Sequence, residues 1–205
     1  MQKFLHVGCG PFKKNQTTKG FNNEKWKEIR LDIDKEYSPD ILGTIKDLSS
    51  IENNSIDAIY SSHNIEHLYY YDVPKAFKEF VRVLNADGFA IITCPDLKTI
   101  AKLLIEDRLL ETAYTSSAGP VAAFDMIFGH RKNINQDNQY MSHHTGFTKK
   151  TITDELIANG FKAVASLSIK ENYVLWIVAS KSKRNENEMK NLAKEHFPPP
   201  SKKIK

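Results

Sequence analysis

A glycine turn and a distant acid are the first residues whose types and spacing could do chemistry. The turn, Gly8-Cys9-Gly10, follows the apolar run 4–7, which predicts a strand. Asp32 lies 24 residues after Gly8, at the end of a second predicted strand. Glycines let a ligand approach the backbone closely, and a carboxylate can accept hydrogen bonds from both hydroxyls of a ribose. Together these residues predict a nucleoside-binding site.

A phosphate-free nucleoside suits this site better than a dinucleotide. A dinucleotide site needs a glycine where the chain has Lys13, and a helix N-terminus that residues 11–24 do not predict. The sequence also lacks the glycine-rich pattern that ends in Lys-Ser or Lys-Thr and binds phosphates. S-adenosylmethionine fits such a site. An NAD-dependent enzyme is an alternative at this point.

Further motifs follow the glycine turn in a fixed order. They are Leu31-Asp32-Ile33-Asp34, Asp47-Leu48, Ser61-Ser62-His63 with Asn64-Ile65-Glu66-His67 after it, and the strand that ends in Cys94-Pro95-Asp96. As a set, these motifs resemble the class I S-adenosylmethionine-dependent methyltransferases, and most of all their type 11 branch. The resemblance covers roughly residues 3–110, and residues 145–161 extend it.

The resemblance implies a role for each matching residue. Gly8, Cys9 and Gly10 would face the methionyl part of the cofactor. Asp32 would bind the ribose hydroxyls, with Ile33 beside the adenine. The remaining cofactor residues would be Asp47 and Leu48 along the adenine edge, and Ser61, Ser62 and His63 beneath the sulfonium.

Two positions depart from the family pattern. His6 stands where an acid usually helps to position the methionine amino group, and Phe12 stands where a third glycine is usual. The first departure supports a second alternative, a non-catalytic module with this fold that serves as a partner in an assembly.

The motif His63-x-x-Glu66-His67 matches the inverted zinc-peptidase pattern literally. That chemistry needs both histidines on one helical face, whereas this motif begins where a predicted strand ends. We therefore expect no metal site. Glu66 and His67 either orient the following turn or face the methyl acceptor, and we take both as candidate catalytic residues.

Residues 112–148 are small and polar, rich in glycine, asparagine and histidine, and we expect them to form an insertion that covers the substrate. His130, His143 and His144 lie in it. Histidine can take a proton from an acceptor hydroxyl near neutral pH. Because His144 adjoins Thr145-Gly146-Phe147, it is the favoured base. The expected acceptor is an oxygen or nitrogen of a small molecule or sugar.

Alternating strands and helices must position these residues. The predicted strands are 4–7, 28–32, 40–43, 56–61, 89–94, 163–169 and 173–180, and the predicted helices are 72–84, 96 to about 110, 149–159 and 185–196, with Asp72 as the N-cap of the first. This order predicts an α/β fold with a Rossmann-like open sheet, mostly parallel, that ends in a C-terminal antiparallel hairpin with an antiparallel strand at the edge. It is the seven-stranded methyltransferase fold that the resemblance implies.

The chain has 205 residues and a net charge of +4, and the excess lies in one segment. Residues 181–205 hold eight basic and three acidic side chains, whereas the other 180 residues hold 21 basic and 22 acidic. We therefore predict a methyltransferase domain at 1–180 and a basic charged tail at 181–205, whose removal leaves cofactor binding intact. The tail lacks interleaved aromatics, which disfavours nucleic acid as a partner.

Location and assembly are less constrained. No apolar run approaches the ~20 residues that span a bilayer, and neither Cys9 nor Cys94 belongs to a Cys-x-x-Cys pair. A reducing cytoplasm fits this cysteine usage. The sequence leaves the oligomeric state open.

Overall fold

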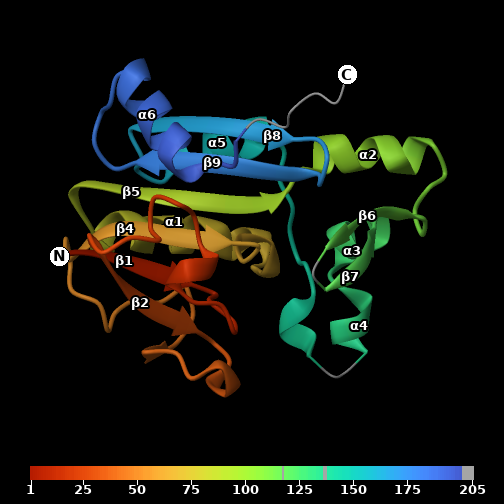
Figure 1. Cartoon of the computed structure of the whole chain (residues 1–205), viewed down its shortest axis with the longest axis horizontal. Helices are drawn as coiled ribbons and strands as arrows, with labels where there is room; N and C mark the ends of the chain where they lie inside the picture. Colours follow the sequence, from red (N-terminus) through yellow and green to blue (C-terminus); the bar gives the residue numbers. More distant parts are fainter. Residues whose placement is uncertain (117, 136–137, 200–205) are drawn as a thin grey trace.

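A computed structural model of the chain describes residues 1–116, 118–135 and 138–199 (Figure 1). Within these residues, the main sheet has the strand order β3-β2-β1-β4-β5-β9-β8. Its strands are β1 (Gln2–Val7), β2 (Trp26–Asp32), β3 (Ile41–Leu42), β4 (Ile56–Ser62), β5 (Leu84–Pro95), β8 (Ala163–Ile169) and β9 (Val174–Ser180). The strands β1 to β5 pair in parallel, and β9 runs antiparallel to both of its neighbours. This confirms the predicted fold class.

The position of the antiparallel strand differs from the prediction. β9 does not lie at the edge but between β5 and β8, so that β8 forms the edge. The reason is the apolarity of the two strands. β9 is almost entirely buried, whereas β8 is only half-buried along its length. A continuously apolar strand gains most from an interior place, where both of its faces are covered.

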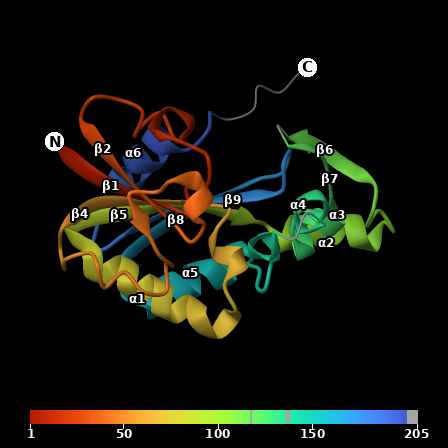
Figure 2. The same ribbon diagram turned by 90° about the horizontal axis from the view of Figure 1, so that it is seen from below.

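Two helices cover one face of the sheet, α1 (Val73–Val83) and α5 (Lys149–Ala158), as Figure 2 shows. Apolar residues at helical spacing put one side of each helix on the strands. Phe77 and Phe80 of α1 and Leu156 of α5 are fully buried in the cluster that these helices form with β1, β4, β5 and β9.

Two local predictions need correction. The Asp72 side chain makes no capping hydrogen bond, because its carboxylate pairs with Lys46 at 3.1 Å and with Lys75 at 2.8 Å. Asp96 does cap α2 (Leu97–Ile105), but this helix ends well before residue 110. Asp107 takes a φ of +55°, which a right-handed helix does not allow.

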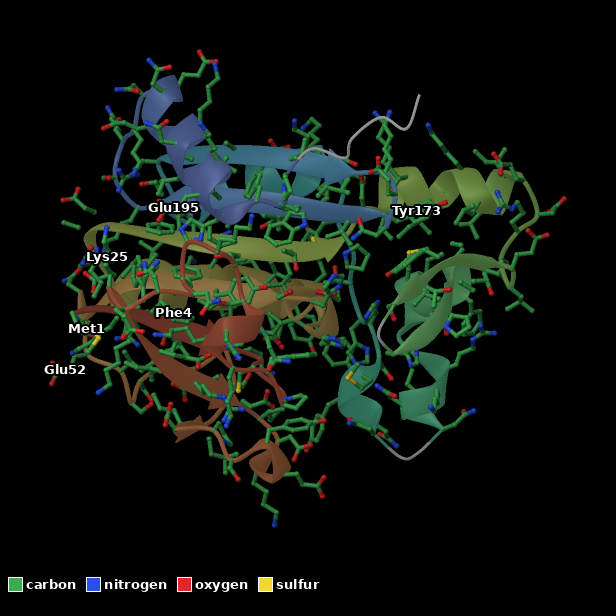
Figure 3. The ribbon with its side chains drawn as sticks, in the orientation of Figure 1. Met1, Phe4, Lys25, Glu52, Tyr173 and Glu195 are labelled. Atoms are coloured by element: carbon green, nitrogen blue, oxygen red, sulfur yellow. The ribbon has the colours of Figure 1, made fainter. Side chains whose placement is uncertain are left out.

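The other face of the sheet is covered by α6 (Glu186–His196) and by residues 11–25, which contain only the short 3₁₀ turn η1 (Lys14–Gln16). Met189 of α6 is buried against Phe4 of β1, and Phe21 stacks on Phe4 at 4.4 Å between ring centroids. Figure 3 labels Phe4 and, on α6, Glu195.

The contacts of α6 correct the prediction of a separate tail from residue 181. His196 is only 3% exposed, and a 2.7 Å hydrogen bond joins its Nδ1 to the hydroxyl of Thr18. The charged side chains of α6 face solvent, but an apolar stripe of this helix packs on the sheet. The helix therefore belongs to the domain, and the boundary predicted at residue 180 cuts through one packed unit.

The predicted insertion lies beyond the carboxyl ends of the strands (Figure 1). It consists of the hairpin β6 (Thr112–Ser116) and β7 (Gly119–Ala122), the short helices α3 (Ala123–Phe128) and α4 (Arg131–Ile134), and the 3₁₀ turn η5 (Gln139–Met141). Met126 packs with Ile100 and Leu103 of α2 in a cluster of its own, and Tyr173, labelled in Figure 3, joins that cluster to the sheet. None of the helices in the described ranges is long and apolar enough to cross a bilayer.

The burial of His196 predicts how stability depends on pH. Burial lowers its pKa from 6.5 to about 4, so the folded state binds fewer protons than the unfolded state between these values. Stability is therefore complete above pH 6.5 and falls as the pH drops towards 4, by about 3 kcal/mol from this group. Urea unfolding at pH 7.5 and 4.5 should give a smaller pH difference for His196→Phe than for the natural chain. His144→Phe, at an exposed histidine, is the control and should leave the difference unchanged. Equal differences in all three proteins would contradict this account.

Candidate cofactor and acceptor site

A cavity of about 860 Å³ opens at the carboxyl ends of β1, β2 and β4. From β1 the strand order runs to β2 and β3 on one side and to β4 and β5 on the other. Open α/β sheets bind their ligands at such a switch point. Its lining includes residues from the glycine turn, the segment after β2, the segment after β4 and the insertion: Gly8, Gly10, Asp32, Ile33, Thr44, Ser62, His63, Asn64, His67, Tyr69, Met141 and His144.

The glycine turn depends on its glycines for conformation and for space. Gly8 and Gly10 have φ angles of +60° and +50°, which favour glycine strongly. A Cβ on Gly8 would lie 2.5 Å from the Asn64 side chain, whereas one on Gly10 would meet no atom within 4 Å. The missing side chain of Gly8 therefore lets the segment after β4 lie directly against the turn.

Two side chains of β2, the strand next to β1, hold the glycine turn by hydrogen bonds. The N–H of Gly10 donates a 2.7 Å hydrogen bond to Asp32, and Arg30 donates a 2.6 Å hydrogen bond to the carbonyl of Gly10. The N–H of Asp34 donates to the other oxygen of Asp32 at 2.9 Å. Asp32 is thus oriented through both oxygens at the cavity wall, where each keeps a free lone pair. Arg30 is a positioning residue that the sequence analysis did not single out.

Several predicted cofactor residues reach the cavity, and others do not. Ser62 and His63 at the end of β4 line it, as does the half-exposed Ile33. Cys9 and Ser61 are fully buried behind the wall. Burial raises the pKa of the Cys9 thiol to about 11, so this side chain stays protonated at neutral pH.

The predicted adenine-edge pair lies elsewhere. Asp47 and Leu48 are absent from the lining, where Thr44, Ile45 and Lys46 take their place. The Leu48 side chain is fully buried in the core, and its N–H donates to Glu79 at 2.7 Å. Asp47 caps the N–H of Ser49 at the surface. The chain turns after Gly43, so the residues nearer to β3 face the cavity.

An acid stands behind His6. The ring of His6 lines the cavity, and its Nδ1 lies 2.7 Å from Glu28 of β2. Glu28 does not itself line the cavity, so it contacts the site only through His6. The parallel pairing of β1 with β2 brings the two side chains together, and no local pattern of residues indicates this contact.

The predicted catalytic residues lie at the insertion end of the cavity. His144 stacks on Tyr69 at 4.3 Å between ring centroids, and both line the cavity together with His67. The backbone carbonyl of Glu66 accepts hydrogen bonds from the N–H groups of His144 and Thr145, at 2.9 and 3.2 Å. The 3₁₀ turn η3 (Ile65–His67) therefore holds the end of the insertion against the site.

Glu66 and His143 lie behind this wall. Burial by itself raises the pKa of the Glu66 carboxyl. His63, at 3.2 Å, and the positive fields of His67 and His143 lower it by more, so the net pKa lies below its ordinary value. Burial lowers the pKa of His143, which favours its neutral form. Glu66 is only 1% exposed and is a buried anion that needs positive charge close by.

Comparison with known families supports the resemblance. Residues 5–92 match the model of the type 11 methyltransferase family, described as a methyltransferase domain. This match and the solved structures of the same fold support a class I S-adenosylmethionine-dependent methyltransferase of the type 11 branch. S-adenosylmethionine is its cofactor, and the residues present fit that group: two glycines with positive φ, an oriented Asp32 carboxylate, and a buried Asn64 amide nitrogen with no hydrogen-bond partner among the described residues. This replaces the NAD-dependent and non-catalytic alternatives.

Several solved structures share the fold at low sequence identity. The PH0226 protein of Pyrococcus horikoshii matches with a TM-score of 0.59 and 15% identity, over 88% of this methyltransferase and 82% of that chain. A 1,6-didemethyltoxoflavin-N1-methyltransferase from Burkholderia thailandensis matches with a TM-score of 0.57 and 12% identity, over 88% and 71%. A methyltransferase from Archaeoglobus fulgidus gives 0.56 and 15%, over 88% and 86%. A search of curated protein sequences finds no match.

The two glycines of the turn predict different costs of substitution. Both Gly8→Ala and Gly10→Ala place a side chain at positive φ, which costs about 1–2 kcal/mol. Only Gly8→Ala also forces the new methyl group into Asn64, so its free energy of unfolding should fall by about 1–3 kcal/mol more. Urea denaturation measures both, and the double variant Gly8→Ala/Asn64→Ala should recover part of the difference. Equal losses for the two single variants would show that Asn64 does not constrain the turn.

Proposed function

We propose that this methyltransferase binds S-adenosylmethionine at the β1–β2 side of the cavity and methylates an oxygen or nitrogen of a small-molecule or sugar acceptor. One observation carries the proposal. A single cavity joins the glycine turn and Asp32 at one end to His144 and the insertion at the other. Its volume of about 860 Å³ lies in the upper range of small-molecule sites and leaves room for two ligands side by side.

In this proposal the cofactor residues divide by position. Asp32 accepts hydrogen bonds from the ribose hydroxyls, and Ile33 packs beside the adenine, with Thr44 to Lys46 along its edge in place of Asp47 and Leu48. Gly8, Gly10 and the free amide of Asn64 face the methionyl part, while Cys9 and Ser61 act from behind the wall through backbone and packing. When bound, the cofactor supplies an already activated methyl group, so positioning dominates the catalysis.

The acceptor enters from the side of the insertion. Residues 112–148 cover that end, and the side chains of Met141, Tyr69 and His144 line it. Asn133, Asn138 and Gln139 add polar groups to these aromatic and apolar side chains, and such a mixed wall suits a small organic acceptor that forms hydrogen bonds. The Burkholderia relative was solved with 1,6-didemethyltoxoflavin and S-adenosylhomocysteine bound, which supports a small-molecule acceptor for this fold.

His144 acts as the general base. Its stacking on Tyr69 fixes the plane of the imidazole, and its exposed position lets it reach an acceptor. An acceptor hydroxyl must lose its proton as the bond from its oxygen to the methyl carbon forms, and the imidazole takes that proton. His67 lines the same wall and contacts the carbonyl of Ser142 at 3.0 Å, which makes it a positioning residue for the acceptor end.

Cofactor binding tests the first half of the proposal. Asp32→Asn should weaken S-adenosylmethionine binding about 10- to 100-fold, because charge-assisted hydrogen bonds contribute about 1.5–3 kcal/mol. Asp47→Asn is the matched control, since the sequence pattern places Asp47 in the site and the cavity excludes it. Calorimetric titration of both variants measures the difference, with circular dichroism to check the fold. Equal weakening by both substitutions would contradict the assignment.

Turnover tests the second half. His144→Ala should lower kcat by about 100- to 10,000-fold for a hydroxyl acceptor, with S-adenosylmethionine affinity unchanged. Full turnover by His144→Ala, with cofactor bound normally, would exclude His144 as the base.

A further inference from the structure

Three ligand-bearing side chains meet behind the acceptor end of the cavity. Glu66 and His67 come from η3, directly after β4, and His143 comes from the insertion, directly after η5. One potential ligand atom from each residue lies within 4.8 Å of the other two. Segments more than 70 residues apart in the chain thus bring a carboxylate and two imidazoles to one point.

The carboxylate of Glu66 is the first sign of a missing partner. It is fully desolvated, and neither of its oxygens has a good hydrogen bond within the described residues. Its nearest charged neighbour, Nδ1 of His63, lies 3.2 Å away on a ring that is about half-exposed. Buried carboxylates are normally paired, hydrogen-bonded or bound to a metal ion. On the side of His67 and His143, one ligand atom of each ring lies within 4.8 Å of a Glu66 oxygen.

The orientation of the two histidines is the second sign. The Nδ1 of His67 donates to the carbonyl of Ser142, and the Nδ1 of His143 donates to the carbonyl of Met126, each at 3.0 Å. A carbonyl oxygen only accepts, so both Nδ1 atoms carry the proton, and in the neutral rings both Nε2 atoms are free to bind. Metal-binding histidines almost always donate their other N–H in this way, which fixes the tautomer and the ring.

We propose that Glu66, His67 and His143 bind a divalent transition-metal ion through one carboxylate oxygen and two Nε2 atoms. Two imidazoles suit zinc and its neighbours and disfavour magnesium and calcium, which prefer oxygen ligands. Bonds of about 2.0–2.1 Å require donor atoms about 3.3 Å apart, so the three side chains close inward slightly on the ion. This inference does not rest on the proposed methyl acceptor.

The ion would have two consequences for the fold around it. It would tie the insertion to η3, strengthening the connection that the Glu66 carbonyl already makes to His144 and Thr145. It would also lie at the wall of the cavity, because His67 lines that wall, and three protein ligands leave a fourth position for water or another oxygen.

The site differs from the zinc-peptidase pattern that the sequence contains. That pattern would use His63 and His67 on one helical face, but η3 is a single 3₁₀ turn and His63 lies before it with a φ of +48°. His143 replaces His63 as the second imidazole. The sequence-based expectation of no metal site followed from the absence of a helix, and it did not consider a ligand from the insertion.

Metal titration of the full chain tests the proposal without cofactor or acceptor. Untagged protein, first treated with a chelator, should bind one zinc ion per chain in a calorimetric titration. Cobalt should give the intense visible bands of a four- or five-coordinate site. Glu66→Gln and His143→Gln should each weaken zinc binding more than 100-fold and abolish the cobalt bands. His144→Gln is the matched control, an adjacent histidine outside the triad, and should bind zinc as the natural chain does.

Thermal unfolding followed by circular dichroism distinguishes a variant that is folded but does not bind zinc from one that is misfolded. The natural chain should gain stability on adding zinc, whereas Glu66→Gln should unfold cooperatively and gain none. Absence of zinc and cobalt binding by the natural chain at micromolar concentrations would overturn the proposal. Binding that persists unchanged in both triad variants would overturn it as well.

Discussion

The hydrogen bonds from β2 to the backbone of Gly10 are the interaction on which the cofactor end of the site depends. Asp32 accepts a hydrogen bond from the N–H of Gly10, and Arg30 donates one to the carbonyl of Gly10. No helix covers the turn, because residues 11–25 form only η1. The polar contacts from the adjacent parallel strand therefore replace a helix N-terminus in holding the glycine turn, and they orient Asp32 at the same time.

The acceptor end is organised around a different constraint, the burial of Glu66. Its backbone carbonyl anchors the end of the insertion, while its side chain lies desolvated between His63, His67 and His143. A buried anion requires compensating charge, and the surrounding histidines are attracted to the Glu66 carboxylate rather than to one another. The segment that covers the cavity is thus connected to the turn after β4, which also carries Asn64 against the glycine turn. The two ends of the cavity share one short piece of chain.

Much of this arrangement could be predicted from local patterns. The apolar runs of β1, β4 and β5 and the helical spacing in α1 specified their elements, because burial patterns repeat along a strand or helix. Gly8, Asp32 and His144 were predicted as site residues, and all three line the cavity. The differences concern neighbours in space. Asp47 and Leu48 do not line the cavity, β9 takes an interior place, and α6 packs on the sheet through an apolar stripe.

The sequence by itself determined the class of fold, the cofactor and the turn that meets it, because these follow from periodicity and from motifs within a few residues. Only the tertiary structure decided which side chains meet across elements. Glu28 stands behind His6 because two strands pair in parallel. His143 joins Glu66 and His67 because the insertion folds back over η3. Such pairings depend on long-range packing and desolvation, which no local spacing encodes.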